Sequence, residues 1–419
     1  MTSPSGAVAD VTIVGGGIVG ICCALSLIES GKTVRLIDRE RPGQGASSGN
    51  AGVISPWSVV PQAMPGLWRN LPRWLLDPGG PVSVRPEHLW KLLPWGLRFL
   101  AEANEKTAKR KSEAMSLLTE PCIDLYRHHL KGTGQEALVR DSYYVNVYRD
   151  PKKANLDLLD YRLRTALGAD IERIEADELR RLEPALSTEF KAAVLIKGQA
   201  RALSPGRIGE VLCNKFAATG GEVICDEVRS VQMAAPDDWS VSCEQGNFQS
   251  HQVVLSAGAW SARLLAPLGI RLPLEGERGY HVMFPETGAG LTNSILDTDH
   301  KVVASSMLEG IRIAGMSEFA GLDMPANDRL FAVLRQVASR LIPELTSMRS
   351  TTWMGTRPSL PDGLPCIGEV PNLPGLHMAF GHSHYGLMMA PKTGKLIADL
   401  VSGRLPNSDL SAFSPKRFG

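Results

Sequence analysis

The sequence contains no long hydrophobic run, and this absence bears on where the protein works. No stretch of about eighteen uninterrupted apolar residues occurs, so the sequence predicts no membrane-spanning helix. The N-terminus lacks a basic segment followed by an apolar one, so we expect no secretory signal. We therefore expect a cytoplasmic protein, and a peripheral contact with the inner membrane stays open as an alternative.

Strong charge and a cysteine framework are also missing. The net charge is +1 over 419 residues, which gives no case for a nucleic-acid partner. The seven cysteines are odd in number and scattered without metal-ligand spacing, so we expect reduced thiols and no metal site. The composition, 43% hydrophobic and 21% charged, is that of an ordinary globular protein, and the length predicts two domains. The oligomeric state is not predicted.

The first forty residues carry the clearest motif. Residues 11–14 form a short apolar run of strand type, 21–30 have helical spacing, and 33–37 form a second strand that ends in Asp38. The glycines of a G-x-G-x-x-G turn, between the first strand and the helix, are Gly15, Gly17 and Gly20. This strand–turn–helix–strand order is the dinucleotide-binding fingerprint.

Each part of the fingerprint has a physical reason. Gly15 permits a tight turn, Gly17 lets the backbone approach a pyrophosphate, and Gly20 lets the helix pack close to the strand. The N–H groups at the start of the helix face the phosphates, and the Asp38 carboxylate can accept hydrogen bonds from a ribose diol. This motif alone does not distinguish NAD from FAD.

Residues 57–98 are rich in tryptophan. Five of the eight tryptophans lie between positions 57 and 95, interleaved with arginine and lysine. This composition is typical of an interfacial membrane patch, and also of a domain interface or a channel to a buried site.

The second half of the chain follows a different pattern. Between 272 and 320, short runs with period two are separated by turns, which predicts antiparallel strands and a second domain. Residues 328–341 and 392–401 have helical spacing, and 102–130 read as a helix interrupted at Pro121.

Three features together resemble the D-amino acid oxidase superfamily of FAD enzymes. They are the fingerprint joined to ASSGNAGVIS, the segment VVLSAGAW, and GTRPSLPDGLPCIG followed by FGHSHYGL. Within that superfamily the chain resembles the D-amino acid dehydrogenase branch, and most of all its glyphosate oxidoreductase-like members. That closer likeness rests on VVPQAMPG, WLLDPGGPVSVRP, ERGYHV, IRIAGMSEFAGL and SPKRFG.

The resemblance implies a fold that combines α/β and α+β parts. A glutathione-reductase-type Rossmann FAD domain would comprise residues 1–60, 151–270 and 350–419. A mainly antiparallel substrate-binding domain would comprise 61–150 and 271–349. Noncovalent FAD is favoured, because members that bind flavin through a cysteine have it just before the Pro-Asp motif, where this chain has residues 353–355, Trp-Met-Gly.

The resemblance also implies a set of FAD-binding residues. Residues of the fingerprint hold the pyrophosphate, Asp38 or Arg39 the ribose, and the Val228 backbone the adenine. Residues 47–52 line the ribityl chain and ring, and 381–387 pass beneath the flavin pyrimidine, where a helix N-terminus stabilises negative charge. The full set is Gly15, Gly17, Ile18, Val19, Gly20, Asp38, Arg39, Ser47, Ser48, Asn50, Ala51, Gly52, Val228, Ala257, Gly258, Gly355, Gly381, His382, Gly386 and Leu387.

Four residues are candidates for catalysis. By resemblance, Arg357 presents a guanidinium to the substrate carboxylate, for which its fork is suited, although a structural salt bridge is an alternative. Tyr280 and His281 lie in a strand whose alternation turns one of them inward, and His384 lies in the flavin loop. No general base is obvious.

These features predict oxidative deamination of a D-amino acid or an N-substituted glycine. Electrons would pass to a quinone or another acceptor, and the 57–98 stretch favours contact with a membrane quinone. The alternative is an oxygen-using amine oxidase of the glycine, sarcosine or glyphosate type. An NAD-dependent dehydrogenase would share only the first forty residues.

Overall fold

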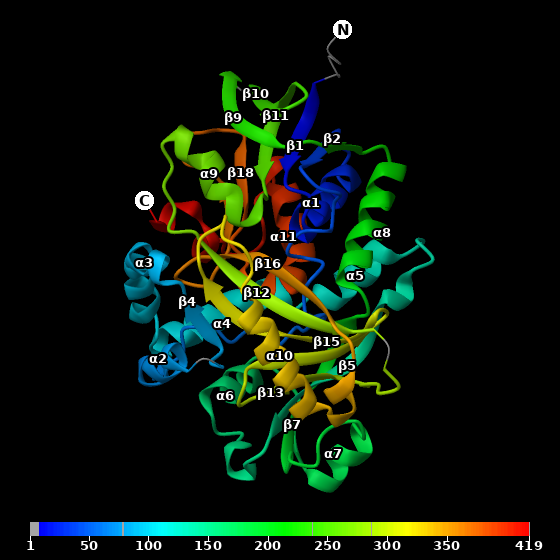
Figure 1. Cartoon of the computed structure of the whole chain (residues 1–419). Helices are drawn as coiled ribbons and strands as arrows, with labels where there is room; N and C mark the ends of the chain where they lie inside the picture. The colour runs from blue at the N-terminus through cyan, green and yellow to red at the C-terminus, as the bar shows by residue number, and fades with distance from the viewer. Residues whose placement is uncertain (1–7, 78, 237, 286, 419) are drawn as a thin grey trace.

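The strands of the protein form two sheets. A computed structural model of the chain describes residues 8–77, 79–236, 238–285 and 287–418. One sheet lies near the N-terminus with helices α1, α8 and α11, and the second lies below it in Figure 1, with α10 against it.

The first sheet is built around the opening strand. Its parallel core has the order β18, β11, β1, β2, β8, with β17 added antiparallel at one edge. A β9–β10–β11 antiparallel unit extends it. The strands are β1 (Ala9–Val14), β2 (Val34–Asp38), β8 (Glu222–Cys225), β9 (Val228–Ala235), β10 (Asp238–Cys243), β11 (Asn247–Leu255), β17 (Cys366–Glu369) and β18 (Leu376–Phe380).

The second sheet is mainly antiparallel. Its order is β16, β12, β15, β14, β13, β5, β7, β3, with β4 on β15 and β6 on β7. Among the described residues, β13–β5 and β15–β4 pair in parallel. The strands are β3 (Val53–Ile54), β4 (Val82–Val84), β5 (Val139–Tyr148), β6 (Ile171–Glu175), β7 (Ala192–Ala202), β12 (Glu275–Phe284), β13 (Ser294–Asp297), β14 (Val302–Met307), β15 (Gly310–Phe319) and β16 (Thr351–Ser359).

Helices cover both sheets. The apolar side of α10 packs on the second sheet, while α1, α5, α8 and α11 share one core. The helices are α1 (Ile18–Glu29), α2 (Leu67–Leu76), α3 (Leu89–Ala101), α4 (Glu105–Thr119), α5 (Cys122–Leu130), α6 (Leu159–Ala166), α7 (Ala176–Leu182), α8 (Pro205–Ala218), α9 (Ser261–Leu265), α10 (Asp328–Leu341) and α11 (Gly386–Val401).

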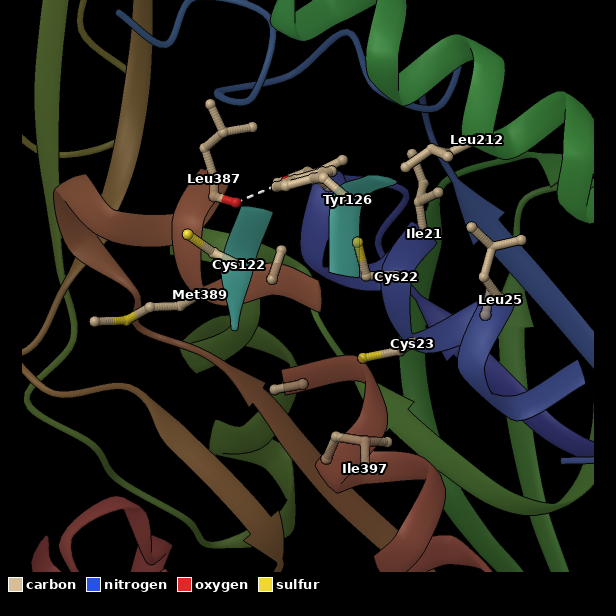
Figure 2. Packing of buried hydrophobic residues seen from close by; sticks show 14 of the residues in the cluster. Ile21, Cys22, Cys23, Leu25, Cys122, Tyr126, Leu212, Leu387, Met389 and Ile397 are labelled. Atoms are coloured by element: carbon tan, nitrogen blue, oxygen red, sulfur yellow. Dashed lines mark hydrogen bonds between the residues drawn. The ribbon is translucent and has the colours of Figure 1, made fainter. Parts of the chain in front are cut away.

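Two local features hold α11 in place. A Cβ at Gly394 would lie 2.4 Å from the Cys22 carbonyl oxygen, so this glycine lets α11 approach α1 closely. Pro391 lies inside α11 and has no N–H for the carbonyl of Leu387 one turn earlier. The buried Tyr126 hydroxyl of α5 donates to that carbonyl at 2.6 Å instead, as Figure 2 shows.

Several predicted elements are confirmed. The fingerprint strands and helix correspond to β1, α1 and β2, and residues 328–341 form α10. The strands expected between 272 and 320 are β12 to β15, with antiparallel pairing of β12–β15, β13–β14 and β14–β15. The helix expected over 102–130 is divided into α4 and α5 around Pro121. The helix expected at 392 begins earlier, at Gly386.

The domain limits stay a prediction, but sheet membership favours changes to them. Strands β6, β7 and β16 lie within ranges assigned to the FAD domain, yet they pair within the second sheet. The partner of β16 is β12, and β7 joins the sheet through β5; both partners are distant in the sequence, so no local pattern could assign these strands. Residues 1–7, 78, 237, 286 and 419 of the predicted ranges lie outside the described residues.

Candidate active site

One long cavity links the two sheets. Its volume is about 1390 Å³, and it runs from the fingerprint turn, past β12 and β16, to helices α2 and α3. The predicted residues that line it are Gly15, Gly17, Ile18, Val19, Asp38, Arg39, Ser47, Asn50, Ala51, Val228, Ala257, Gly258, Tyr280, Gly355, Arg357, His382, His384, Gly386 and Leu387. The predicted residues outside its lining are Gly20, Ser48, Gly52, His281 and Gly381.

The fingerprint turn forms a cradle without side chains. Gly15 has φ +108°, and a Cβ there would lie 2.5 Å from the Ser256 carbonyl oxygen, so only glycine fits. A Cβ at Gly20 would lie 1.9 Å from the Gly15 carbonyl oxygen, which confirms close helix–strand packing at Gly20. Gly17 caps α1 without a side-chain hydrogen bond, and Ile18 N donates to Ser47 Oγ at 2.9 Å. This helix N-terminus therefore suits a phosphate.

Asp38 is tied to the turn. Its Oδ2 accepts from Gly16 N at 2.5 Å and its Oδ1 accepts from Glu40 N at 2.9 Å. Burial raises the pKa of the Asp38 carboxyl, while these backbone N–H groups lower it. Each carboxylate oxygen has a further lone pair that can accept from a ribose hydroxyl. Beside it, the Arg39 guanidinium lies 4.1 Å from the Trp260 ring centroid, so it is committed to an aromatic partner.

The loop after β2 lines the cavity in part. Ser47, Asn50 and Ala51 face it, and Asn50 Oδ1 accepts from Gly52 N at 2.8 Å, which shapes the turn. Ser48 instead donates through Oγ to the Gln44 carbonyl at 2.9 Å. The Ser48 side chain therefore stabilises the loop and does not line the cavity.

A buried carboxylate, Glu277, organises the polar end of the cavity. Its Oε1 lies 3.0 Å from Arg357 Nη1 and 3.1 Å from His384 Nε2. Ser317 Oγ donates to Oε1 at 2.5 Å, and Ser359 Oγ donates to Oε2 at 2.7 Å. The Glu277 side chain is 3% exposed. Four donors thus surround one carboxylate, which matches its capacity to accept hydrogen bonds.

The charge state of Glu277 follows from these contacts. Burial alone raises the pKa of a carboxyl group, but His384 and Arg357 act in the opposite direction. Together with the Ser317 hydroxyl they hold the pKa of Glu277 well below its ordinary value. Glu277 is therefore ionised, and it neutralises one positive charge beside the cavity.

Two glycines let the side chains of this face lie flat. Gly279 on β12 pairs with Gly355 on β16. A Cβ at Gly279 would lie 2.1 Å from Arg357 Nη2, and a Cβ at Gly355 would lie 2.1 Å from the Trp353 ring. Because these two glycines have no side chains, Arg357 and Trp353 can pack directly on the sheet.

The structure places Tyr280 and His281 away from this polar cluster. The Tyr280 hydroxyl donates to Glu318 Oε2 at 2.5 Å, and its ring packs edge-on against Phe331 of α10. His281 stacks on Trp353 with ring centroids 5.0 Å apart, and its Nδ1 donates to the Gly49 carbonyl at 3.2 Å. Both side chains are buried and already partnered.

The loop before α11 contributes two histidines of different character. His384 reaches Glu277, and Gln62 and Ser383 contact its Nδ1. His382 is buried and its Nε2 lies 3.0 Å from Thr393 Oγ1. Burial lowers the pKa of His382 to about 3, so it stays neutral. Gly381 has φ +91° and supports the turn from outside the cavity.

The structure places part of the tryptophan-rich stretch in the cavity wall and part of it at the surface. Trp74 and Trp95 line the cavity, and Trp95 Nε1 donates to the Ser359 carbonyl at 3.2 Å. Trp68 and Trp90 are exposed at the surface. The stretch therefore lines the cavity and also exposes apolar side chains, and contact with a membrane stays a prediction.

Sequence reasoning missed Glu277. Residues 277, 279 and 281 alternate along β12, so Glu277 shares a face with Gly279, whose Cβ position Arg357 covers. The alternation along β12 indicates which face Glu277 lies on, but it does not identify its partner Arg357, which is 80 positions away in the sequence.

Comparison with known proteins decides the family. Residues 10–400 match the DAO family, described as FAD dependent oxidoreductase. The chain belongs to this family. It is 36% identical over 416 residues to a D-amino-acid oxidase of Bradyrhizobium diazoefficiens, covering 97% of this chain and 98% of that protein. It is 29% identical over 422 residues to a D-amino acid dehydrogenase of Vibrio atlanticus, covering 96% and 99%.

Solved structures share the fold. A glycine oxidase from Geobacillus kaustophilus has a TM-score of 0.74 at 24% identity, covering 98% of each chain. An L-proline dehydrogenase from P. horikoshii has a TM-score of 0.76 at 18% identity, with the same coverage. This DAO-family enzyme thus combines a Rossmann FAD domain with a substrate domain, uses FAD, and oxidises an amino acid or amine.

The cavity fits the cofactor. The glycine cradle, the N-terminus of α1 and the Asp38 carboxylate line the same cavity, as a dinucleotide requires. The seven cysteines are all free, and none lines the cavity. Cys366 is buried, with its Sγ 3.4 Å from Arg417 Nη1. Among the described residues, no helix is both long and apolar enough to span a membrane.

Proposed function

We propose that this DAO-family enzyme deaminates a D-amino acid or an N-substituted glycine. The observation that carries the proposal is the polar cluster formed by Arg357, Glu277 and His384 in an otherwise largely apolar cavity. A carboxylate substrate needs a cation at one end and apolar space for its side chain, and the cavity offers both.

Arg357 is the proposed anchor for the substrate carboxylate. Its hydrogen bonds within the described residues use Nη1, which reaches Glu277 and the Met316 carbonyl. Nε and Nη2 therefore keep N–H groups for a bidentate pair with a carboxylate. Because Glu277 holds Nη1 and the bare Gly279 supports the guanidinium, the fork is fixed before the substrate arrives.

His384 is the proposed contact for the substrate amine. Its Nε2 lies 3.1 Å from Glu277 Oε1, and a substrate amine would reach its Nδ1 by displacing the side chains that now contact this nitrogen. Gln62 and Ser383 surround that nitrogen. Tyr280 and His281 are better explained as structural, because their polar atoms are bonded away from the cluster.

When bound, FAD supplies the acceptor for the Cα hydride at N5, and the resulting imine hydrolyses in water to a 2-oxo acid. The protein binds the carboxylate, orients the amine and holds Glu277 ionised. Noncovalent binding of FAD is supported by the absence of any cysteine from the cavity lining.

The proposed electron acceptor is a membrane quinone. Residues of α2 and α3 line the end of the cavity, and these helices expose Trp90 (79%) and Trp68 (61%) at the surface, so we place the entrance between them. The sequences of both helices contain arginine or lysine and no acidic residue. Exposed tryptophan and leucine with basic residues suit the surface of an anionic membrane, so peripheral contact there is part of the proposal. Molecular oxygen is the alternative acceptor.

Absorbance of the flavin tests the substrate class. The purified holoenzyme is mixed without oxygen with D-amino acids, their L-enantiomers, glycine, sarcosine and other N-substituted glycines. We expect bleaching with D-amino acids or N-substituted glycines, and an unchanged spectrum with L-enantiomers. No bleaching across the panel would overturn the proposal.

Product analysis tests the acceptor. Peroxide yield in air is compared with turnover on a soluble quinone analogue, using the same substrate. A fast quinone reaction with little peroxide supports the quinone proposal. Stoichiometric peroxide would favour the oxidase alternative.

A further inference from the structure

A second cluster of metal-ligating residues lies where α1 and α5 end. Glu29 is the last residue of α1, and His128 and His129 lie in the last turn of α5. Glu29 Oε1 lies 3.5 Å from His128 Nε2 and 3.9 Å from His129 Nδ1, and all three ligand atoms lie within 4.8 Å of one another. In Figure 1, α5 lies on the side of the molecule opposite α3.

His129 has no structural partner that explains its burial. Its side chain is fully buried, and neither ring nitrogen has a hydrogen-bond partner among the described residues. A buried imidazole normally has both nitrogens satisfied, because leaving a polar atom unpaired is costly. Its Nδ1 lies 3.9 Å from Glu29 Oε1, so one of the two unpaired nitrogens faces the cluster.

We propose that Glu29, His128 and His129 bind a divalent transition-metal ion such as Zn²⁺. Two imidazoles and a carboxylate are ligands that zinc prefers, and solvent can supply a fourth. His129 is fixed by packing, while Glu29 and His128 are partly exposed and can move inward by the few tenths of an ångström to about one ångström that coordination requires.

Local electrostatics both favour and oppose a cation at this cluster. The C-termini of α1 and α5 meet here, and each carries partial negative charge. Lys215 and Lys395 oppose the cation, and the Lys215 Nζ is held by the carbonyls of His129 and Lys131, at 2.7 and 3.1 Å. The Glu29 carboxylate adds an oxygen ligand for a divalent ion.

The proposed ion would join two elements of the FAD site. Helix α1 presents its N-terminus to the fingerprint cradle, and α5 carries Tyr126, which holds the Leu387 carbonyl. A bound ion would therefore link the pyrophosphate helix to the helix that supports the flavin loop.

Calorimetry with Zn²⁺ tests the site. Untagged holoenzyme is stripped with a chelator, dialysed and titrated near neutral pH. We expect one Zn²⁺ per chain, and at least about tenfold weaker binding in both Glu29→Gln and His128→Ala, because each loses a ligand on the surface without disturbing the core. The control is His251→Ala, which removes an exposed histidine 2.9 Å from Asp238 elsewhere on the protein.

A thermal readout separates this site from others. Zn²⁺ should raise the melting temperature of the wild type and of His251→Ala, and this rise should be lost in Glu29→Gln. No zinc uptake by the wild type would overturn the proposal. Zinc binding that survives both Glu29→Gln and His128→Ala would also overturn it, because the ion would then lie elsewhere.

Discussion

A carboxylate that is almost fully buried needs donors on every side, and Glu277 has them in Arg357, His384, Ser317 and Ser359. This arrangement orients the two groups proposed to meet the substrate. Removing the carboxylate would therefore disturb both of them without touching the FAD cradle.

We expect Arg357→Lys to raise the KM for the amino acid substrate by about 10- to 100-fold, with a smaller effect on kcat. An ammonium cannot reproduce the bidentate fork, and a charged hydrogen bond contributes about 1.5–3 kcal/mol. Steady-state kinetics measure the split. Arg173→Lys, at an exposed pair with Glu175, is the control and should leave KM unchanged. An unaltered KM in Arg357→Lys would show that Arg357 is a structural ion pair.

At the residue scale, the sequence predicted those parts of the site whose residues are close together in the chain. The cradle of Gly15, Gly17 and Gly20 was accessible because its spacing lies within six residues. Glu277 could not be predicted as a site residue, because its role depends on contacts with Arg357 of β16 and His384 of the loop before α11. The side-chain directions of Tyr280 and His281 also required the packing of α10, which the strand alternation alone does not give.

At the scale of elements, Pro391 and Tyr126 form a compensating pair. We expect Tyr126→Phe to lower the free energy of unfolding by about 1–3 kcal/mol, because it leaves the buried Leu387 carbonyl without a donor. Urea unfolding followed by circular dichroism measures this loss.

A double-mutant cycle identifies the cause of that loss. In a Pro391→Ala background, residue 391 regains an N–H that can donate to the Leu387 carbonyl, so Tyr126→Phe should cost less there. Equal losses in both backgrounds would mean that the hydroxyl acts on something other than this carbonyl.

Helices α2 and α3 carry the second prediction at this scale. We expect Trp90→Ser to weaken binding to anionic vesicles, because burying a tryptophan ring contributes to interfacial binding. Co-sedimentation with vesicles of mixed anionic and neutral lipid measures it. Leu405→Ser is the control, since Leu405 is 92% exposed but lies outside these helices. Loss of binding in both variants, or in neither, would contradict a specific contact through α3.

Elements with strong local patterns were predicted well, and pairings between distant strands were not. Residues 328–341 form α10 because apolar residues recur on one face of that segment. Strand β7 joins the second sheet by pairing with β5 and β3, and these two pairings have no local signature.

At the scale of the whole molecule, buried neutral histidines predict acid sensitivity. Burial lowers the pKa of His281 and His382 to about 3 and that of His377 to about 4. Below pH 6.5 the unfolded chain binds protons that the folded protein does not, so stability is complete above pH 6.5 and falls as the pH decreases toward 4.

We expect each of these histidines to reduce the free energy of unfolding by up to about 1.4 kcal/mol per pH unit in that window. Urea unfolding at pH 7.5, 6.5 and 5.5 measures the slope. The variant His377→Gln should reduce the slope of the free energy of unfolding against pH by about the contribution of one histidine. A stability that does not change between pH 7.5 and 5.5 would contradict the prediction.

The continuity of the cavity has a kinetic consequence. The same space extends from α3 to Arg357, so the amine and a bulky acceptor that both enter between α2 and α3 would exclude one another. The enzyme should then alternate between two half-reactions, with the first product leaving before the acceptor enters. Double-reciprocal plots at several acceptor concentrations should be parallel lines, and a high concentration of either reactant should inhibit the reaction of the other. Intersecting lines would mean that the two reactants approach the flavin by separate routes.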